Sequence, residues 1–320
     1  MVSGITIQEL STAIRERALD LGFAACGFSR AEALPGDAVR LREWLDEGLH
    51  AGMAYMQNHF EKRTDPRQLV DGARSVISVL HSYHTHRRQD DPEAPVVSTY
   101  AFGRDYHKVL KKKLNLLMEH IRSMVPETKG RVFVDSAPVL DRAWARQAGL
   151  GWIGKNSHLI SRSHGSYVFI GEIILNIPLA YHKIPEHDFC GDCTRCIEAC
   201  PTQAILENRT LDAGRCISYQ TIENRGEIDQ EVRENLAKRI FGCDICQEVC
   251  PWNRKAPLHT ESEFEPRTGW TTLSMDEWTG LEEEDFDRLF NGSAVRRAGY
   301  LKIMNTLGYL QQSGEAGKIE

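Results

Sequence analysis

The stretch FCGDCTRCIEACP, residues 189–201, contains four closely spaced cysteines and decides how the chain is organised. Cys190, Cys193, Cys196 and Cys200 are followed by Pro201, which gives the spacing C-x2-C-x2-C-x3-C-P. With this spacing, three cysteines surround one iron–sulfur cluster and the fourth binds a neighbouring cluster. The stretch therefore predicts a domain built around metal clusters, and the rest of the sequence must indicate what the clusters serve.

A second, altered copy of the pattern lies further along the chain. Cys243, Cys246 and Cys250 precede Pro251, and Cys216 can replace the first cysteine that this copy lacks. The crossover rule of two-cluster proteins then predicts two [4Fe–4S] clusters. The predicted ligands are Cys190, Cys193, Cys196 and Cys250 for one cluster and Cys200, Cys216, Cys243 and Cys246 for the other. A pair of zinc sites is disfavoured, because zinc explains neither the third cysteine of the run nor the Cys-Pro steps.

The composition is typical of a soluble globular protein, with 41% hydrophobic and 26% charged residues. The net charge of −6 excludes a uniformly basic nucleic-acid-binding protein but permits a local basic groove. Residues 1–23 mix charges with apolar residues and lack a signal-peptide core. The most apolar stretch, residues 167–181, is interrupted by Glu172 and Pro178. We therefore expect a cytoplasmic protein without a membrane segment, whose cysteines stay reduced.

Strand-forming and helix-forming patterns alternate before the cysteines. Apolar, β-rich runs predict strands at 23–29, 75–83, 131–137 and 165–175, and helical patterns cover about 6–21, 37–48, 105–124 and 138–148. This alternation predicts an α/β domain over residues 1–185. A bacterial-ferredoxin-like two-cluster domain at 186–256 and a short C-terminal helical region at 257–320 follow. In that region Ser293 is placed to cap a helix, with an apolar face of Ala298, Leu301, Met304 and Leu307.

The glycine-rich stretch GLGWIGKN, residues 149–156, resembles two nucleotide-binding motifs but fits neither. It follows a helical pattern instead of a strand, and Asn156 stands where a phosphate loop needs Ser or Thr. The remaining interpretation of this stretch is a glycine-rich bend that lets the backbone approach another large ligand. Asp135, at the end of a predicted strand, either supports the following turn or faces a cleft as an acid.

Basic and histidine-rich runs give weaker signals. His81, His84 and His86 lack a nearby carboxylate or cysteine, so a zinc site there is disfavoured. The run HKVLKKK, residues 107–113, is either a solvated helix face or, with arginines elsewhere, part of a phosphate-contacting surface.

Several blocks of the chain resemble the epoxyqueuosine reductase family, the cobalamin-dependent iron–sulfur enzymes of queuosine-tRNA biosynthesis. The blocks are HAGMAYM, EKRTDPRQLVDGARSVISV, YAFGRDYHKVL, VDSAPVLDRAWARQAGLGWIGKNSHLI, GSYVFIGEI, the first cysteine motif, CISYQTIENRGEI and FGCDICQEVCPWN. They run in order from about residue 50 to 256. The resemblance implies an enzyme that removes the epoxide oxygen of epoxyqueuosine at the wobble position of a tRNA anticodon, with two electrons, two protons and release of water.

The resemblance also implies roles for individual residues. The α/β domain would bind cobalamin, and the clusters would pass electrons to its cobalt. Asp135 matches the family's proposed proton donor, and a dry pocket beside the corrin would favour its protonated form. The implied cobalamin contacts are Lys155, Asn156, Ser157 and Leu159, with Asn58, Tyr100, Asp135 and Ser218 as further candidates. The implied tRNA contacts are Arg142 and Arg225.

The chain departs from the family and from other cobalamin proteins in places. The cobalamin signature D-x-H-x-x-G is incomplete, since Asp105 and His107 fit its first half but Leu110 replaces the glycine. This matches a family that binds cobalamin by another fold, resembling reductive dehalogenases. Asn58 stands where the family usually has an arginine, and longer relatives end in a fuller HEAT-like helical region.

Two other functions stay open on the sequence alone. One is a dehalogenase-like, cobalamin-dependent reductase of a small molecule, and the other is a non-catalytic, ferredoxin-type electron carrier. The enzyme would need an external low-potential electron donor. We expect a monomer, because the electron path is part of the same chain.

Overall fold

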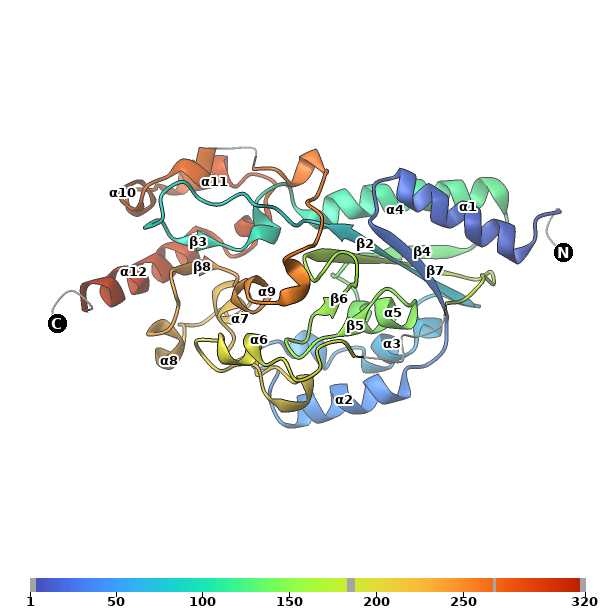
Figure 1. Cartoon of the computed structure of the whole chain (residues 1–320), viewed down its shortest axis with the longest axis horizontal. Coiled ribbons are helices and arrows are strands. Elements are labelled where there is room, and N and C mark those ends of the chain that lie inside the picture. Colours follow the sequence, from blue (N-terminus) through green and yellow to red (C-terminus); the bar gives the residue numbers. More distant parts are fainter. Residues whose placement is uncertain (1–3, 183–187, 267–268, 317–320) are drawn as a thin grey trace.

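A four-stranded sheet forms the centre of the N-terminal half of the molecule (Figure 1). The computed structural model of the chain describes residues 4–182, 188–266 and 269–316. The sheet contains, in spatial order, β1 (Ala25–Arg30), β2 (Ser75–Ser82), β7 (Val168–Leu175) and β4 (Gly130–Phe133). The four predicted strands are confirmed. Every neighbouring pair is antiparallel, although alternating strands and helices more often build a parallel sheet.

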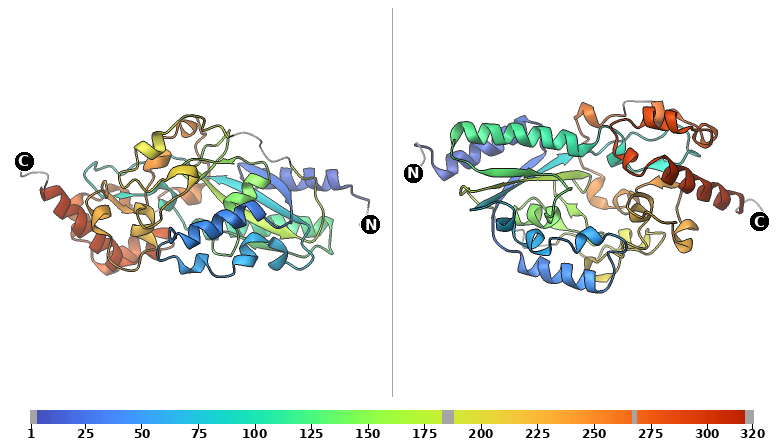
Figure 2. Two further views of the ribbon diagram at one scale, coloured as in Figure 1. Left: turned by 90° about the horizontal axis from the view of Figure 1, so that it is seen from below. Right: turned by 180° about the vertical axis from the view of Figure 1, so that it is seen from behind.

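Helices cover both faces of this sheet. α1 (Ile7–Asp20) and α4 (Tyr106–Met124) lie on one face, and α5 (Asp141–Gln147) lies on the other, with α2 (Pro35–Asp46) and α3 (Phe60–Thr64) further out (Figure 1, Figure 2). Successive side chains of a strand point to opposite faces of the sheet, so each strand contributes residues to both helical layers. Ile77 of β2 packs in the core under α1 and α4, whereas Val76 packs with Trp144 of α5.

The glycine-rich stretch forms a hairpin of β5 (Trp152–Ile153) and β6 (Leu159–Ile160). A Cβ atom added at Gly151 would lie 2.2 Å from the carbonyl oxygen of Ile160. The two strands can therefore pair only if this position has no side chain. The hairpin reaches the cysteine region, because Lys155 Nζ donates a hydrogen bond to the carbonyl of Gly191 at 2.8 Å.

Short elements build the cysteine region. α6 (Arg195–Glu198) and α9 (Ile245–Glu248) each lie within one of the cysteine runs and pack against each other. Between them lie α7 (Ile217–Ile222), α8 (Gln230–Arg233) and β8 (Arg239–Phe241). β8 pairs in parallel with β3 (Val96–Val97), so a segment of the predicted 1–185 domain packs with the second half of the chain.

The C-terminal region is helical, as predicted. It contains α10 (Met275–Thr279), α11 (Glu283–Leu289) and α12 (Tyr300–Ala316), packed around buried aromatic side chains such as Trp270 and Trp278. A HEAT-like character of this region stays a prediction. Neither α12 nor any other helix within residues 4–182, 188–266 and 269–316 is long and apolar enough to cross a bilayer.

The predicted apolar face of the last helix is wrong in part. Leu301 is 73% exposed, whereas Ile303 and Leu307 are buried. Ser293 caps the short 3-10 helix Ala294–Arg297 instead of α12. The chain turns at Gly299, where φ is +83°, before α12 begins. The helical period does not continue through this turn. A period of about 3.6 residues that is counted from Ala298 into α12 therefore assigns the wrong residues to the buried face.

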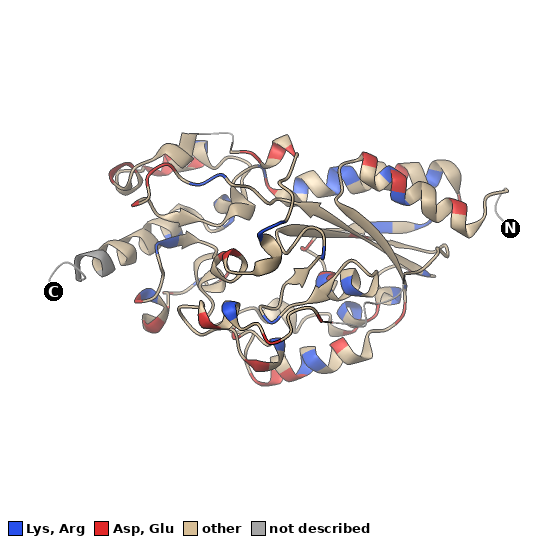
Figure 3. Ribbon diagram, viewed as in Figure 1, with Lys and Arg blue, Asp and Glu red and all other residues tan. Residues whose placement is uncertain are grey.

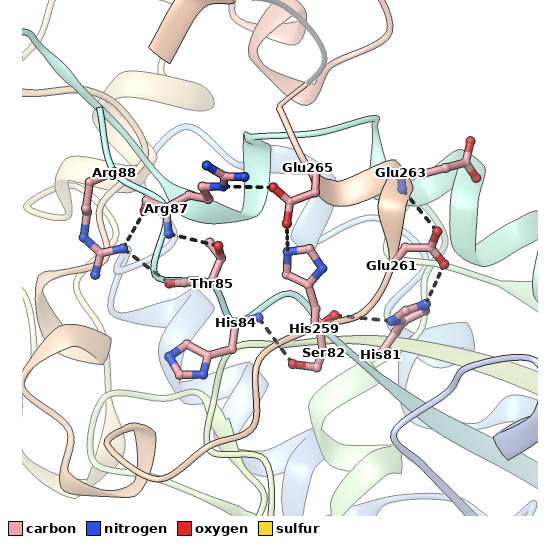
Figure 4. Close-up of polar contacts among 10 residues, drawn as sticks. All are labelled: His81, Ser82, His84, Thr85, Arg87, Arg88, His259, Glu261, Glu263 and Glu265. Carbon is pink, nitrogen blue, oxygen red and sulfur yellow. Dashed lines mark hydrogen bonds and ion pairs between the residues drawn. The ribbon is translucent and has the colours of Figure 1, made fainter. Parts of the chain in front are cut away.

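A network of polar contacts connects residues 259–265 to the end of β2 (Figure 4). Glu261 lies 3.5 Å from His81 and 2.5 Å from Lys113 of α4. Glu265 lies 3.6 Å from His259 and 3.2 Å from Arg87. The hydrogen bond from His81, helped by Lys113, holds the pKa of Glu261 well below its ordinary value. The histidine-rich run thus joins the sheet to the C-terminal half through polar contacts, and Arg87 and Lys113 add ion pairs with the same two glutamates.

Candidate active site

The predicted cluster ligands form two neighbouring groups of free thiols. The first group is Cys190, Cys193, Cys196 and Cys250, which line one cleft. The second group is Cys200, Cys216, Cys243 and Cys246, which interact electrostatically with one another. Cys246 also interacts with Cys196, so the groups adjoin. The structure therefore brings together both predicted sets, including the crossover of Cys250.

The sequence spacing of these cysteines fits a cluster better than a single zinc ion, because zinc explains neither the third cysteine of the first run nor the Cys-Pro steps. The first cysteine group lines a cleft of about 40 Å³ together with Lys155, Asn156 and Trp252.

Aromatic side chains cover the first cysteine group. Trp152 Nε1 lies 3.5 Å from the sulfur of Cys190, and the Trp152 and Trp252 rings are 4.9 Å apart. Phe189 packs on both rings and is 41% exposed. The first group therefore lies close to the surface of the molecule.

A cavity of about 620 Å³ adjoins the second cysteine group. Its walls come from the start of α4, the turn after β4, the segment that includes α7, and residues 291–297. Cys216 lines it together with Asp135, so one cavity reaches from the second group to the predicted acid. Its titratable or cationic lining residues also include Tyr100, Asp105, Tyr106, His107, Lys108, Arg142, Tyr219, Glu223, Arg296 and Arg297.

Asp135 lies at the tip of a strained turn that follows β4. Its φ is +52°, a left-handed conformation that Asp adopts more readily than most residues. The N–H of Ser136 donates to the carbonyl of Val134 at 2.5 Å and closes a three-residue turn. Such strain is concentrated at functional sites. The turn places the Asp135 side chain on the cavity, where 51% of it is exposed.

Side chains from the start of α4 contact the Asp135 carboxylate. The Tyr106 hydroxyl donates to Asp135 Oδ2 at 2.6 Å, and His107 Nε2 lies 3.2 Å from the same oxygen. The other ring nitrogen of His107 lies 2.7 Å from Asp105 Oδ1. His107 thus bridges two carboxylates, an arrangement that is satisfied when both of its nitrogens carry protons.

These contacts decide the charges of the pair. Burial lowers the pKa of His107, but its hydrogen bonds with Asp105 and Asp135 outweigh this and raise the pKa to about 9. Burial raises the pKa of Asp135, but hydrogen bonds from His107 and Tyr106 bring it below its ordinary value. The expectation that Asp135 is protonated beside a corrin stays a prediction. In the arrangement described here, the donors around Asp135 outweigh its burial and favour the proton on His107.

Positive side chains also reach the cavity. Its cationic lining residues are Lys108, Arg142, Arg296 and Arg297. Arg142 donates to the carbonyl of Ser157, and Arg297 pairs with Glu223 at 2.9 Å. Basic residues recur along α4, so positive charge continues from the cavity onto that helix (Figure 3).

Two family models match the chain. Residues 189–253 match a family described as a 4Fe-4S double cluster binding domain, and residues 63–136 match one described as epoxyqueuosine reductase QueG, DUF1730. An epoxyqueuosine reductase of Leadbetterella byssophila is 46% identical over 312 residues, which are 96% of this chain and 100% of the relative. The chain belongs to the epoxyqueuosine reductase family.

Solved structures of epoxyqueuosine reductases share this fold. One contains an epoxyqueuosine-modified tRNA-Tyr stem loop and matches with a TM-score of 0.89 at 30% identity, over 98% of this chain and 84% of that chain. The Bacillus subtilis enzyme, with a TM-score of 0.89 at 29% identity and the same coverage, has its aspartate-bearing catalytic loop swung out of the active site. A catabolic reductive dehalogenase shares the fold at 16% identity, with a TM-score of 0.52 over 96% of this chain and 37% of that chain.

The predicted cobalamin contacts of this epoxyqueuosine reductase family member divide between two places. Tyr100, Asp135 and Ser218 line the large cavity, whereas Lys155 and Asn156 line the cleft of the first cysteine group. Their roles as cofactor contacts stay predictions. The structure nevertheless brings the first three together from distant parts of the sequence.

The remaining predicted contacts lie elsewhere. The Ser157 hydroxyl donates to the carbonyl of Arg209, and Leu159 is 2% exposed in the core under β2. Asn58 is exposed and lines neither the cleft nor the cavity. Of the two predicted tRNA contacts, Arg142 lines the cavity, and Arg225 is exposed outside it.

Part of the epoxyqueuosine reductase site was not predicted from the sequence. Asp105 and His107 were not predicted to form a bridge to Asp135, and Tyr106 and Arg297 had no predicted role. The position of Asp105 as a helix cap could have indicated its contact with His107, because a cap side chain turns back over the first turn. No local signal could have placed Tyr106 against Asp135, which lies 29 residues away.

Proposed function

We propose that this protein reduces epoxyqueuosine to queuosine at the wobble position of tRNA, with two [4Fe–4S] clusters and cobalamin as cofactors. The observation that carries the proposal is the cavity in which Cys216, the Asp135–His107 pair and several cations meet. Removing an epoxide oxygen as water requires electrons, protons and room for the substrate. The cavity adjoins groups suited to each of these needs.

The residues present fit these cofactors. A cavity of about 620 Å³ lies within the usual range of ligand pockets, about 300–1,000 Å³. Tyr100 and Ser218 would hold cobalamin there, with Asp135 facing it. Asn156 Nδ2 is buried and has no hydrogen-bond partner in the described part of the chain, so it offers a donor near the cysteine cleft. When bound, cobalamin supplies a cobalt centre through which electrons reach the epoxide.

The two cysteine groups define an electron path from the surface to the cavity. The first group lies beneath the partly exposed Phe189, and Cys216 of the second group lines the cavity. Clusters held by these thiols supply single electrons. An external low-potential donor would therefore reduce the first cluster, and the second would serve the cavity.

Asp135 and His107 together form the proton donor. His107 carries the proton in the resting arrangement, and its Nε2 lies 3.2 Å from Asp135 Oδ2. Transfer of that proton to Asp135 gives the acid that protonates the epoxide oxygen as a carbon–oxygen bond breaks. Asp105 orients His107, and the Tyr106 hydroxyl orients the carboxylate. The Bacillus subtilis relative, whose catalytic loop carries an aspartate, supports this role for Asp135.

The cations of the cavity would hold the tRNA. Lys108, Arg142 and Arg297 can neutralise phosphates of the anticodon loop, and the exposed Arg225 can extend that surface. Unpaired loop bases can turn out of the stack into a pocket. The relative solved with a modified tRNA stem loop supports a tRNA substrate for this chain.

Anaerobic turnover tests this function. The protein is loaded with iron, sulfide and cobalamin, reduced, and mixed with tRNA that carries epoxyqueuosine. The tRNA is digested and its nucleosides are weighed. We expect a nucleoside lighter by one oxygen, and none when cobalamin is omitted. Persistence of the epoxide while cobalt is reduced would overturn the tRNA assignment and favour a dehalogenase-like small-molecule reductase. Failure to bind cobalamin would favour an electron carrier.

A cytoplasmic location and a monomeric state stay predictions. The mass of the purified protein in solution would check the monomeric state.

A further inference from the structure

A second pair of acids lies in the sheet behind the predicted active site. Glu172 lies near the centre of β7 and is 0% exposed. Within the described residues, neither of its carboxyl oxygens has a hydrogen-bond donor, and the same is true of Asp141 Oδ1. Asp141 is the first residue of α5, which packs on this part of the sheet. The two carboxyl groups interact directly, and the proposed chemistry uses neither of them.

Glu172 has no donor of its own among the described residues, whereas Asp141 has a backbone donor, so a proton on Glu172 lets the two carboxyl groups share a hydrogen bond. Burying a carboxylate without a compensating partner is costly, so one group takes up a proton and donates it to the other. Burial, with the charge of Asp141, raises the pKa of Glu172 well above its ordinary value. Burial also raises the pKa of Asp141, to about 6. Near pH 7 Glu172 is therefore the neutral member of the pair.

The two acids differ in access. Glu172 is sealed between β2 and β4, where its register partners are Ser78 and Phe133. Asp141 is partly exposed, and its negative charge is favoured at the N-terminus of a helix and by the neighbouring Arg142. A proton held by Glu172 can therefore leave through Asp141.

The pair is close to the proposed proton donor. Phe133, opposite Glu172, lies two residues before Asp135 in the chain. Both Asp141 and Glu172 interact electrostatically with Asp135. The other charged or titratable groups that interact with Asp141 are Arg63, Tyr106 and Arg142. The pair thus shares the electrostatic environment of Asp135.

We propose that Asp141 and Glu172 form a proton reserve that resupplies Asp135 during the reduction. The inference rests on the proposed function, in which the epoxide, two electrons and two protons give an alkene and water. The His107–Asp135 pair supplies the first proton, to the epoxide oxygen as its first bond to carbon breaks. Glu172 releases the second through Asp141 to Asp135, and this proton leaves with the oxygen as water. The reserve refills from solvent. Neither acid touches the reacting atoms, so both act through Asp135 as positioning residues.

Glu172→Gln and Asp141→Asn test the reserve in the fully loaded protein. Gln matches the shape and hydrogen-bonding of neutral Glu172 but cannot release a proton. We expect about a tenfold or greater loss of turnover with unchanged cobalamin and cluster spectra, in line with general acid catalysis. The infrared band of a protonated carboxyl should disappear from this variant at pH 8. Asp141→Asn should also lose turnover, because Asn cannot pass the proton on. Glu16→Gln, an exposed acid of α1, is the matched control.

The outcomes separate the reserve from the function it serves. A wild-type protein without the protonated carboxyl band, or a Glu172→Gln variant with full turnover, overturns the reserve. If Glu172→Gln does not fold, Asp141→Asn decides, and full turnover in that variant overturns the reserve. If wild-type protein leaves epoxyqueuosine unchanged, the proposed function fails. The carboxyl band would then still report whether Glu172 is protonated.

Discussion

Asp135 and Glu172 are two acids of one sheet region that carry different charges. Asp135 is half exposed, and hydrogen bonds from Tyr106 and His107 keep it ionised despite the burial around it. Glu172 is fully buried, and its carboxyl partner Asp141 brings a negative charge instead of a donor. The difference shows that the groups facing a carboxylate, together with its depth, decide where the proton lies. One region can then hold both an ionised acid and a neutral one.

The largest expected effect comes from removing the acid on the cavity. Asp135→Asn should lower epoxyqueuosine turnover by about 10²–10⁴-fold, the range for loss of a general acid. Asn tolerates a positive φ, so the turn should survive. Mass analysis of digested tRNA measures the loss, and Asp20→Asn on the exposed end of α1 is the control. Wild-type turnover in Asp135→Asn would remove this acid from the mechanism.

A smaller effect should follow from removing the cation beside Asp135. His107→Gln takes away the resting proton, so turnover near pH 7 should fall by about 10–10²-fold. In wild-type protein turnover should decline as pH rises through about 9, where His107 loses its proton. The pH profile of turnover from 6 to 10 measures both effects. A decline in the variant at the same pH as in wild type would show that His107 does not control it.

The same histidine predicts a change in stability with pH. Its pKa is about 9 in the folded protein and about 6.5 in an unfolded chain. The bridge between Asp105 and Asp135 therefore stabilises the fold fully below pH 6.5, and this stabilisation is lost as pH rises through 9. We expect His107→Gln to be less stable at pH 6 by on the order of 1 kcal/mol and equal to wild type at pH 10. Denaturant unfolding at the two pH values checks this, and an equal gap at both would contradict it.

The smallest effect should be on stability at the neutral acid. Glu172→Gln should change the free energy of unfolding at pH 7 by less than about 1 kcal/mol, because a neutral amide replaces a neutral carboxyl of similar shape. Unfolding in urea measures the change. A large loss of stability would indicate that Glu172 is ionised in the folded protein. Glu172 and Asp135 would then carry the same charge.

Much of the fold could be read from local patterns. The strands at β1, β2, β4 and β7 follow from apolar runs, and the cysteine spacing indicates both ligand groups. Strand direction could not be predicted, because alternating helices and strands fit either arrangement. The face of α12 was misread because Gly299 breaks the helical period, which a count across the break ignores.

Only those residues of the candidate site that belong to a recognisable sequence motif were predicted. Asp135, Tyr100 and Ser218 come from the family resemblance, and the structure places all three on one cavity. The charge of Asp135 could not be predicted, since it depends on Tyr106 and His107, which approach it only through tertiary packing. Glu172 looks in the sequence like an interruption of an apolar strand. Its partner in α5 is visible only in the folded chain.

The cavity wall is made by parts of the chain that leave the ribosome at very different times. The sheet strands end at Leu175, whereas the wall also needs residues 211–223 and 291–297. Domains generally fold from the N-terminus as synthesis proceeds. A nascent chain can therefore complete its sheet, and then release all of its cluster cysteines, before the pocket for substrate exists. The ability to act on tRNA would arise last, after the parts that handle electrons are in place.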